Sequence, residues 1–410
     1  AGSGLGITSS ILIPTLHHWD GTCYVVDISG DICQNVEVPN KIIFNPDDMN
    51  GALYNIFFPV DMFENDADKN EALEQLAFQL MPLETNMTDT SVFFLTEGRQ
   101  ILTAAMITYY HQGMDFPQIC KRIISSSWST LFSEIDQNGN YEAKQYINSF
   151  EGTNEKNIAG CKQACDSALK LFATNSHVYN AIGREREGKE AFTPEQLENK
   201  NIFIVIQDSK LELYEPLVHI ITAQCMEYFS NRDNNNQHTI LMCLDEFASF
   251  GHLEITPALR KLRKKHVRIM VLTQSLADID LIYGRDERMA MLNNFAYKIV
   301  LGCSDSDTQE YFSRLIGEKE VYRKAVSKNG KQVTNTKTEV KERIVPPAEL
   351  ARLGRHMILL AEGKYYKLTK NYYFELDFWD RVKKCINNLS RIQEEDFSEK
   401  NTLSLTDENK

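Results

Sequence analysis

Six short apolar segments constrain the fold of this chain more than any other feature. They show no alternation of apolar and polar positions and lie at residues 23–28, 41–44, 202–206, 240–244, 268–273 and 298–302. Such runs are typical of parallel strands that are buried on both faces. Helical periodicity marks several of the stretches between them, at residues 214–229, 257–265 and 306–316. The alternation predicts an α/β fold, in which helices cover both faces of a doubly wound sheet.

A second region, residues 63–172, interrupts this alternation. Apolar residues recur there at helical spacing, with little strand signal, over residues 71–80, 91–110, 116–124 and 158–172. We therefore expect an inserted all-α domain. The predicted division of the chain is a sheet domain in two parts (1–62 and 177–385), the all-α insertion (63–176) and a polar tail (386–410). Residues 327–341, with alternating Lys, Thr and Val, are expected to form a hairpin or loop.

Composition excludes several classes of protein. The 410 residues include 44 Lys and Arg against 57 Asp and Glu, a net charge of −13, so any contact with nucleic acid must be local. The apolar runs are far shorter than the roughly 18 to 20 residues that cross a bilayer, and we expect no membrane-spanning segment. The nine cysteines are scattered without a CxxC pair, which favours a reducing compartment.

The first eight residues, AGSGLGIT, have the length and glycine content of a phosphate-binding loop. In such a loop backbone N–H groups surround phosphates and a helix follows. Thr8 is the candidate Mg²⁺ ligand, but Ile7 stands where a lysine normally reaches the β- and γ-phosphates. A plain turn into a helix remains the alternative. The candidate ATP-binding residues are Ser3, Gly4, Leu5, Gly6, Ile7, Thr8 and Ser9.

The predicted strand 240–244 ends in two adjacent carboxylates, Asp245 and Glu246. This is the pattern of a Walker B motif. Asp245 is the candidate Mg²⁺ ligand and Glu246 the candidate general base that polarises the attacking water. A solvated strand end is the alternative interpretation.

Two further features follow in the chain. Gln274 comes directly after the predicted strand 268–273, where ATP-driven folds place a residue that senses the γ-phosphate; the alternative is that it only closes the strand. Residues 260–268 carry six positive charges in nine positions. Such a run is a solvated helix face, an arginine finger for a neighbouring subunit's nucleotide, or a local DNA contact, and the sequence leaves all three open.

Several of these segments together resemble the TraG/TraD family of type IV secretion coupling proteins. The most specific part is residues 244–254 (LDEFASFGHLE), Arg263, and residues 267–284 with TQSLADI and YG. Residues 10–16, 26–31 and 296–299 extend the likeness. The insertion is similar to the family's all-α domain in position and length only.

The resemblance implies a RecA-like P-loop NTPase sheet, assembled as a homo-hexamer with ATP and Mg²⁺ between subunits. Such a motor links a relaxase-bound DNA strand to the type IV secretion channel, and its all-α domain recognises the substrate. By match to the family's motifs, Asp245 and Glu246 take the Walker B roles, Gln274 the sensor role and Arg263 the finger role. Family members also carry an N-terminal membrane anchor, absent from this chain, so we expect a soluble fragment of a protein at the cytoplasmic face of the inner membrane.

Three departures from the family pattern matter. Ile7 replaces the loop lysine, Ser29 stands where a lysine usually follows the second strand, and no strand precedes Ala1. That strand normally lies at the centre of the sheet, which favours a fragment. The sequence thus predicts an ATP hydrolase that translocates DNA, with a hydrolysis-deficient substrate-receptor platform as the alternative. An unrelated RecA-like packaging ATPase or helicase does not account for the match at residues 247–254.

Overall fold

A five-stranded parallel sheet lies at the centre of the structure, a computed structural model that describes residues 4–83, 87–185, 188–189, 191–329 and 332–375. The strand order is β2-β5-β1-β6-β7, and every neighbouring pair is parallel. The strands are β1 (Thr22–Asp27), β2 (Lys41–Phe44), β5 (Asn201–Val205), β6 (Ile240–Leu244) and β7 (Val267–Val271). All five carboxyl ends therefore meet at one edge of the sheet.

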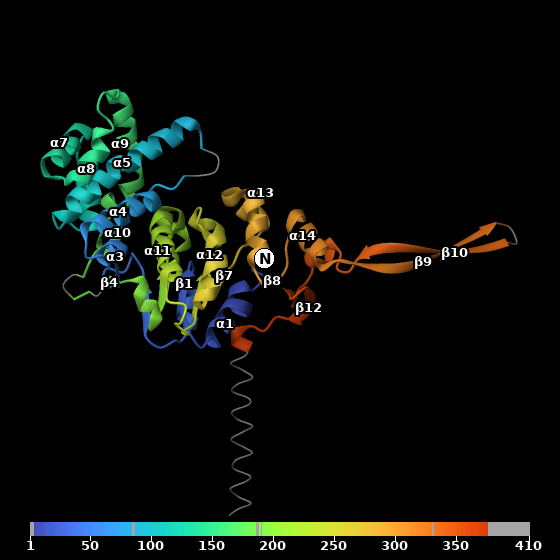
Figure 1. The fold of residues 1–410 in the computed structure, drawn as a ribbon. Coiled ribbons are helices and arrows are strands. Elements are labelled where there is room, and N and C mark those ends of the chain that lie inside the picture. Colours follow the sequence, from blue (N-terminus) through green and yellow to red (C-terminus); the bar gives the residue numbers. More distant parts are fainter. Residues whose placement is uncertain (1–3, 84–86, 186–187, 190, 330–331, 376–410) are drawn as a thin grey trace, which may run out of the picture.

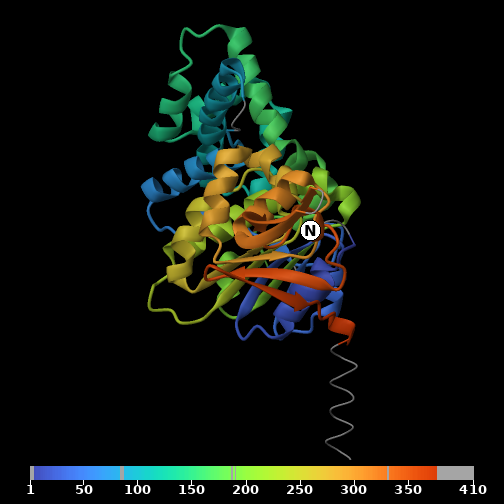
Figure 2. The same ribbon diagram turned by 90° about the vertical axis from the view of Figure 1, so that its right-hand side faces the viewer.

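Helices cover both faces of this sheet (Figures 1 and 2). They are η1 (Thr8–Leu12, a π-helical turn), α1 (Ile13–His17), α2 (Asp31–Asn35), α11 (Leu211–Asn231), α12 (Ile255–Lys261), α13 (Leu276–Asn294) and α14 (Ser306–Ile316). Successive residues of β1 point to opposite faces. Tyr24 and Val26 pack in a cluster with α11, whereas Cys23 and Val25 pack in a second cluster with α1 and α2. This two-sided burial explains why the strands are continuously apolar.

Five of the six predicted strands are confirmed in the parallel sheet, but the prediction for residues 298–302 is wrong. That segment forms β8 (Tyr297–Val300), which pairs antiparallel with β11 (His356–Ala361) in a separate sheet of order β12-β11-β8. The third strand is β12 (Lys364–Thr369). A short apolar run indicates a strand but not its direction or its partner. The side chains of Tyr297 and Ile299 are exposed, which is the half-buried pattern of an antiparallel strand.

The predicted helices of the sheet domain are observed with small changes. Residues 306–316 form α14, whose first turn is capped by the Asp305 side chain and which ends at Gly317, where φ is 104°. The predicted helix 257–265 divides into α12 and a 3-10 turn, η5 (Leu262–Lys265). His266 ends this turn with a positive φ of 59°. Short 3-10 turns also occur as η2 (Pro194–Glu198), η3 (Asp208–Lys210) and η4 (Phe247–Phe250), and α15 is Pro347–Leu350.

The inserted region is helical throughout its described residues. Its helices are α3 (Phe58–Asp61), α4 (Asp66–Leu80), α5 (Asp89–His111), α6 (Phe116–Ser125), α7 (Trp128–Asn138), α8 (Tyr141–Asn148), α9 (Glu155–Thr174) and α10 (Ser176–Ala181). Each helix from α4 to α10 begins after a residue whose side chain accepts a hydrogen bond from the first turn. These caps are Asn65, Thr88, Asp115, Ser127, Asn140, Asn154 and Asn175, and they satisfy N–H groups that have no partner within the helix.

The chain enters and leaves the helical region at one place. β3 (Leu53–Tyr54) pairs in parallel with β4 (Ala191–Phe192), and Tyr54 also bridges to Ile182. Segments on either side of the insertion therefore lie side by side, although more than a hundred residues separate them in the sequence. Figure 1 shows the helical region rising beside the sheet domain.

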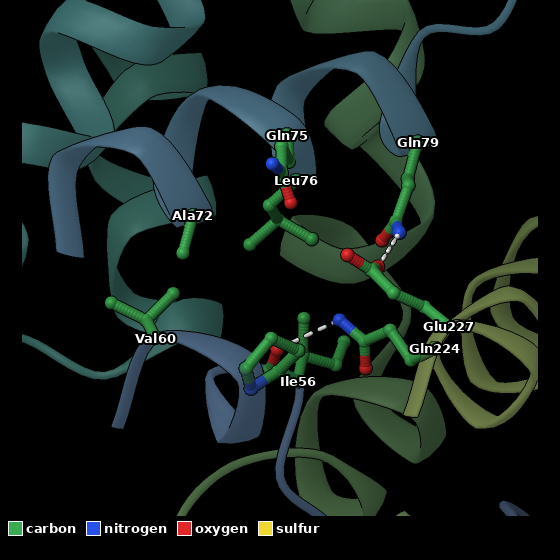
Figure 3. A pocket seen from close by; sticks show the side chains of 9 residues that line it. Ile56, Val60, Ala72, Gln75, Leu76, Gln79, Gln224 and Glu227 are labelled. Atoms are coloured by element: carbon green, nitrogen blue, oxygen red, sulfur yellow. Dashed lines mark hydrogen bonds between the residues drawn. The ribbon is translucent and has the colours of Figure 1, made fainter. Parts of the chain in front are cut away.

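Helix α4 also packs directly on α11 of the sheet domain (Figure 3). Gln79 Nε2 donates a hydrogen bond of 2.7 Å to Glu227 Oε2, and Gln224 Nε2 donates one of 3.0 Å to the Ile56 carbonyl. The pocket between these residues, lined also by Leu76, has room for about one water molecule. The helical region is therefore attached through side chains as well as through the chain.

A long hairpin projects from the opposite side of the molecule (Figure 1). β9 (Glu318–Asn329) pairs antiparallel with β10 (Gln332–Arg343), and these two strands form a sheet of their own. The predicted hairpin or loop at 327–341 is thus a hairpin, and it starts nine residues earlier than expected. Twelve residues per strand give it a length of about 40 Å.

A pocket of about 700 Å³ lies between β7 and β8. Its walls include Ile269 and Val271 from β7, Ile299 from β8, and Ile7 from the glycine loop. Among the described strands, β7 pairs only with β6, and β8 pairs only with β11. The expectation of a strand before the glycine loop concerns residues outside the given sequence and stays a prediction.

Candidate nucleotide site

The two adjacent carboxylates lie at the carboxyl end of β6, a strand buried along its whole length. The Glu246 amide donates a hydrogen bond of 3.2 Å to Asp245 Oδ1. Burial, followed by the nearby carboxylates Glu246 and Asp27, raises the pKa of Asp245 to about 7. Three carboxyl groups, those of Asp27, Asp245 and Glu246, thus lie close together at this edge of the sheet.

Asp27 ends the neighbouring strand β1 and is fully buried. Its Oδ1 accepts a hydrogen bond of 2.9 Å from the Gly30 amide, and its Oδ2 accepts one of 2.7 Å from the Cys33 amide. These bonds fix the turn from β1 into α2, where Gly30 has a φ of 79°. Burial raises the pKa of Asp27, although the backbone hydrogen bonds lower it. Sequence reasoning placed this residue only within the family likeness, although its position after a strand resembles that of Asp245.

Gln274 lies beside Glu246, because β7 is the next strand of the sheet. Its Nε2 donates a hydrogen bond of 3.0 Å to Glu246 Oε1. Glu246 has the left-handed backbone conformation, with φ 50° and ψ 48°, which is costly for a residue that is not glycine. The backbone of Glu246 is thus strained. Its carboxylate is bound by the side-chain amide of Gln274, which follows the neighbouring strand β7.

The segment that follows Glu246 is anchored to helix α13. The Phe247 ring stacks on the Tyr283 ring, with centroids 5.3 Å apart and planes 13° apart. The Leu253 amide donates a hydrogen bond of 3.1 Å to the Tyr283 hydroxyl. Phe247, Leu253 and Tyr283 are all part of the family-like sequence pattern. The contacts of Phe247 and Leu253 with Tyr283 fix the loop that follows Asp245 and Glu246.

The glycine loop is described from Gly4 onward, and Ser3 lies outside the described residues. Gly4 and Gly6 have φ angles of 77° and 84°, which side chains rarely allow. The Ser10 amide and hydroxyl both donate to the Gly6 carbonyl, at 2.8 and 2.6 Å, as the chain turns into η1 and α1. Thr8 and Ser9 occupy the first turn of η1. Both glycines thus have the positive φ angles that a tight turn can require, and the phosphate-binding role of the loop stays a prediction.

Ile7 is an apolar residue at the position where a phosphate-binding loop normally carries a lysine. Its side chain is partly buried against the apolar cluster that contains Leu12, Leu16 and Cys23. It also lines the 700 Å³ pocket, whose wall includes Gln274. One pocket thus borders both the glycine loop and the residue at the end of β7.

Two residues near the C-terminal end of the described chain contact this loop and were missed by the sequence analysis. Lys370 Nζ donates a hydrogen bond of 3.0 Å to the Leu5 carbonyl. A Cβ atom added to Gly6 would lie 2.8 Å from the Tyr372 ring. No spacing rule relates residues that are 365 positions apart, so the sequence held no signal for this contact.

Arg263 borders the same 700 Å³ pocket as Ile7 and Gln274, but it lies at the other end of β7 from Gln274. It lies in η5, just before β7 begins, whereas Glu246 and Gln274 lie at the carboxyl ends of β6 and β7. Its side chain is exposed, and its carbonyl accepts a hydrogen bond of 3.2 Å from Arg268. Within one chain Arg263 therefore does not join the acid pair.

Two structural findings concern membranes and metal ions. None of the described helices is both long enough and apolar enough to span a bilayer. Likewise, no three His, Cys, Asp or Glu residues in the described ranges are arranged to hold a metal ion by themselves. A cation at Asp245 would therefore draw other ligands from a phosphate and water, as Mg²⁺ usually does.

The fold defines the class of the protein: an α/β protein with a RecA-like parallel sheet and helices on both faces. Solved structures of the coupling protein TrwB have the same fold. The unbound TrwBdeltaN70 structure superposes with a TM-score of 0.72 at 21% identity, over 90% of this chain and 83% of that chain. The TrwB complex with ADP and Mg²⁺ gives 0.69 at 21% identity, over 90% and 83%.

The chain belongs to the family described as Type IV secretory system Conjugative DNA transfer, whose sequence model matches residues 1–400. Its relatives include the VirD4 protein of Agrobacterium fabrum, 20% identical over 94% of this chain and 59% of that protein. The conjugal transfer protein TraG of Escherichia coli is 24% identical over 37% of this chain and 27% of that protein. This chain thus spans about three fifths of the length of VirD4.

Proposed function

We propose that this chain is the nucleotide-driven motor of a type IV secretion coupling protein, an ATP hydrolase that translocates DNA. The observation that carries the proposal is the contact of Glu246 with Gln274 beside Asp245, at the carboxyl edge of a sheet whose fold is that of TrwB. ATP-driven folds place a general base and a γ-phosphate sensor in this relation. TrwB itself has been solved with ADP and Mg²⁺ and with a non-hydrolysable ATP analogue.

The residues present fit a nucleotide with Mg²⁺. Gly4 and Gly6 turn the loop so that its amides can surround phosphates, and a helix follows. A cation near Asp245 would favour the charged form of a carboxyl whose pKa now lies near 7. Asp245 and the Thr8 hydroxyl are the proposed Mg²⁺ ligands. Bound Mg²⁺ supplies charge neutralisation at the phosphates.

Glu246 and Gln274 have separate roles in the proposed reaction. Glu246 accepts the proton of the attacking water, so its carboxylate must be free of competing donors. Gln274 donates to that carboxylate in the structure and would turn to the γ-phosphate when nucleotide is present. Gln274 lies in the short connection between β7 and α13. Its change of partner from Glu246 to the γ-phosphate would therefore couple the state of the nucleotide to the positions of these two elements.

The finer partners follow from family membership and are part of the proposal. The motor acts as a homo-hexamer, receives DNA bound to a relaxase through the helical region, and passes it to components of the secretion channel. The full-length protein lies at the cytoplasmic face of the inner membrane through an N-terminal anchor. Arg263, exposed at the far end of β7, acts on the nucleotide of the neighbouring subunit.

The decisive experiment compares ATP turnover and ATP binding of the chain and of Glu246→Gln, with and without DNA. The motor proposal expects DNA-stimulated turnover in the parent and a loss of about 100-fold or more in the variant, with ATP binding retained. Equal turnover by the two proteins would remove Glu246 from the mechanism. The matched control is Glu254→Gln, which changes an exposed glutamate further along the same loop and should leave turnover unchanged.

A second candidate function rests on Ile7. An apolar residue at this position removes the charge that normally holds the β- and γ-phosphates. A chain that binds its substrates but does not hydrolyse ATP would be a receptor platform of the same secretion system. Binding of ATP without turnover by the parent chain, in the presence of DNA, favours this second function.

A further inference from the structure

Lys370 is a buried lysine that lies against the glycine loop. It follows β12, and its amide donates a hydrogen bond of 2.8 Å to the Arg355 carbonyl, which fixes the backbone at that point. Only 1% of the residue is exposed. Its ammonium group donates to the Leu5 carbonyl at 3.0 Å, in the middle of the loop.

Among the described residues, the ammonium group of Lys370 has no ion pair with a carboxylate, and burial lowers its pKa. Lys162 shows the contrast: it is also buried but forms an ion pair with Asp166. Burying an ammonium group without an anion is costly, so such a group indicates a missing anionic partner.

The neighbouring residue Tyr372 shows that this segment is fitted to the loop. Its ring is so close to Gly6 that a Cβ atom there would lie 2.8 Å from Cε1. Lys370 and Tyr372 thus contact two successive parts of the loop, Leu5 and Gly6. The segment that carries the lysine is held on the loop by packing as well as by a hydrogen bond.

We propose that Lys370 supplies the positive charge of the phosphate loop in place of Ile7, and so binds the phosphates of the nucleotide. This inference rests on the proposed function, because it requires a nucleotide at the loop. An ammonium group has three donors, and the Leu5 carbonyl takes one of them. The remaining donors and the charge serve the phosphates, as the lysine of an ordinary phosphate loop does.

The test is the affinity of the full chain and of Lys370→Met for ATP, ADP and adenosine, measured by calorimetry. We expect the variant to bind ATP and ADP about 10- to 100-fold more weakly. Adenosine, which has no phosphate, should bind the two proteins equally. Lys370→Arg, which keeps the charge, should retain more of the affinity than Lys370→Met.

Lys162→Met is the control. Lys162 is also a buried lysine, and it forms an ion pair with Asp166. It lies in α9 of the helical region, away from the glycine loop, so its variant should bind ATP as the parent does. A similar loss in both variants would show a general effect of removing a buried lysine and would overturn the inference.

Thermal unfolding without nucleotide separates binding from structure. If Lys370 serves the phosphates, Lys370→Met relieves an unpaired buried charge and the melting temperature stays the same or rises. A large fall in melting temperature, or an equal loss of affinity for adenosine, would show a purely structural role and overturn the inference. If the parent binds ATP and Lys370→Met binds it equally well, the inference fails while the proposed function stands. A parent that binds no nucleotide overturns both.

Discussion

Asp245 is a titratable residue whose environment in the folded protein differs strongly from water. Its pKa of about 7 lies above the ordinary value of 3.8, chiefly because of burial. Between about pH 4 and pH 7 the folded protein therefore holds a proton at this site that the unfolded chain has lost. Stability falls with rising pH wherever the folded state binds more protons. Asp245 thus contributes a loss of stability as the pH rises through this interval.

We predict that Asp245→Asn removes this contribution. The melting temperatures of the variant and of the parent should differ little at pH 4 to 5, and the variant should be the more stable at pH 8. Melting curves over this range, without Mg²⁺ or nucleotide, measure the effect. Curves that stay parallel from pH 5 to pH 8 would contradict a raised pKa at Asp245. Other titrating groups are common to both proteins and cancel in the comparison.

At position 7, Ile7→Lys is expected to raise ATP affinity or turnover. A charge-assisted contact of this kind contributes about 1.5 to 3 kcal/mol. The gain should be larger in the Lys370→Met background, because there the loop has no other cation. Ile7→Met, which stays apolar, is the control. The same ATP affinity and turnover in the parent and in Ile7→Lys would contradict the prediction.

The sequence could predict those site residues that directly follow a strand, because an apolar run shows where the strand ends. Asp245 follows the buried strand β6, and Gln274 follows the neighbouring strand β7, which is partly buried. Glu246 and Gln274 are in contact. The same reasoning could have found Asp27. The strained backbone of Glu246 and the contact of Lys370 with Leu5 depend on tertiary packing, which no local pattern records.

Gly4 and Gly6 of the glycine loop differ in the space that surrounds them. Gly6→Ala would place a Cβ atom 2.8 Å from the Tyr372 ring at a φ of 84°, whereas Gly4→Ala meets nothing within 4 Å at a φ of 77°. Backbone strain alone costs about 1 to 2 kcal/mol. We expect Gly6→Ala to lower the melting temperature and the ATP affinity more than Gly4→Ala does. Equal effects of the two variants would show that Tyr372 does not restrict the loop.

Strands buried on both faces were predicted well because their apolar runs admit few other interpretations. β8 was misplaced, since residues 298–302 are as apolar as the parallel strands but pair with β11, more than fifty residues further along. α7 and α8 were not predicted as separate helices, although each begins at a capping residue, Ser127 and Asn140. Both helices are short, with 11 and 8 residues, and each buries only two of them, so neither gives a long apolar repeat.

For the whole molecule, the position of Arg263 leads to a test of assembly. Arg263 lies at the opposite end of β7 from Gln274, which fits a role at the nucleotide site of another subunit. We predict that mixing Arg263→Ala with Glu246→Gln restores ATP turnover, because a subunit with intact Glu246 then receives Arg263 from its neighbour. Mixing Glu246→Gln with Gln274→Ala, whose residues share one site, should restore none. The absence of restoration in the first mixture would exclude the finger role.

We propose that the helical insertion, residues 63–176, is a substrate-binding domain mounted on the sheet domain. Excision of residues 63–172, with a short Gly/Ser linker across the adjacent ends, should leave a protein that binds ATP as the parent does but no longer recruits its DNA-protein substrate. Its melting temperature should fall, because α4 packs on α11 through Leu76 and the Gln79–Glu227 bond. Loss of the folded state on excision would show that the boundaries are wrong.

The β9–β10 hairpin has a consequence for the solubility of the protein. Among the described strands, each of its two strands pairs only with the other, which leaves both outer edges open along twelve residues. Open edges are templates for pairing between molecules. Lys319, Arg323, Lys337 and Lys341 lie along these strands, and charged residues at an edge oppose such pairing. Electrostatic repulsion is screened by salt, so the ionic strength of the solution governs how readily these hairpins associate with one another.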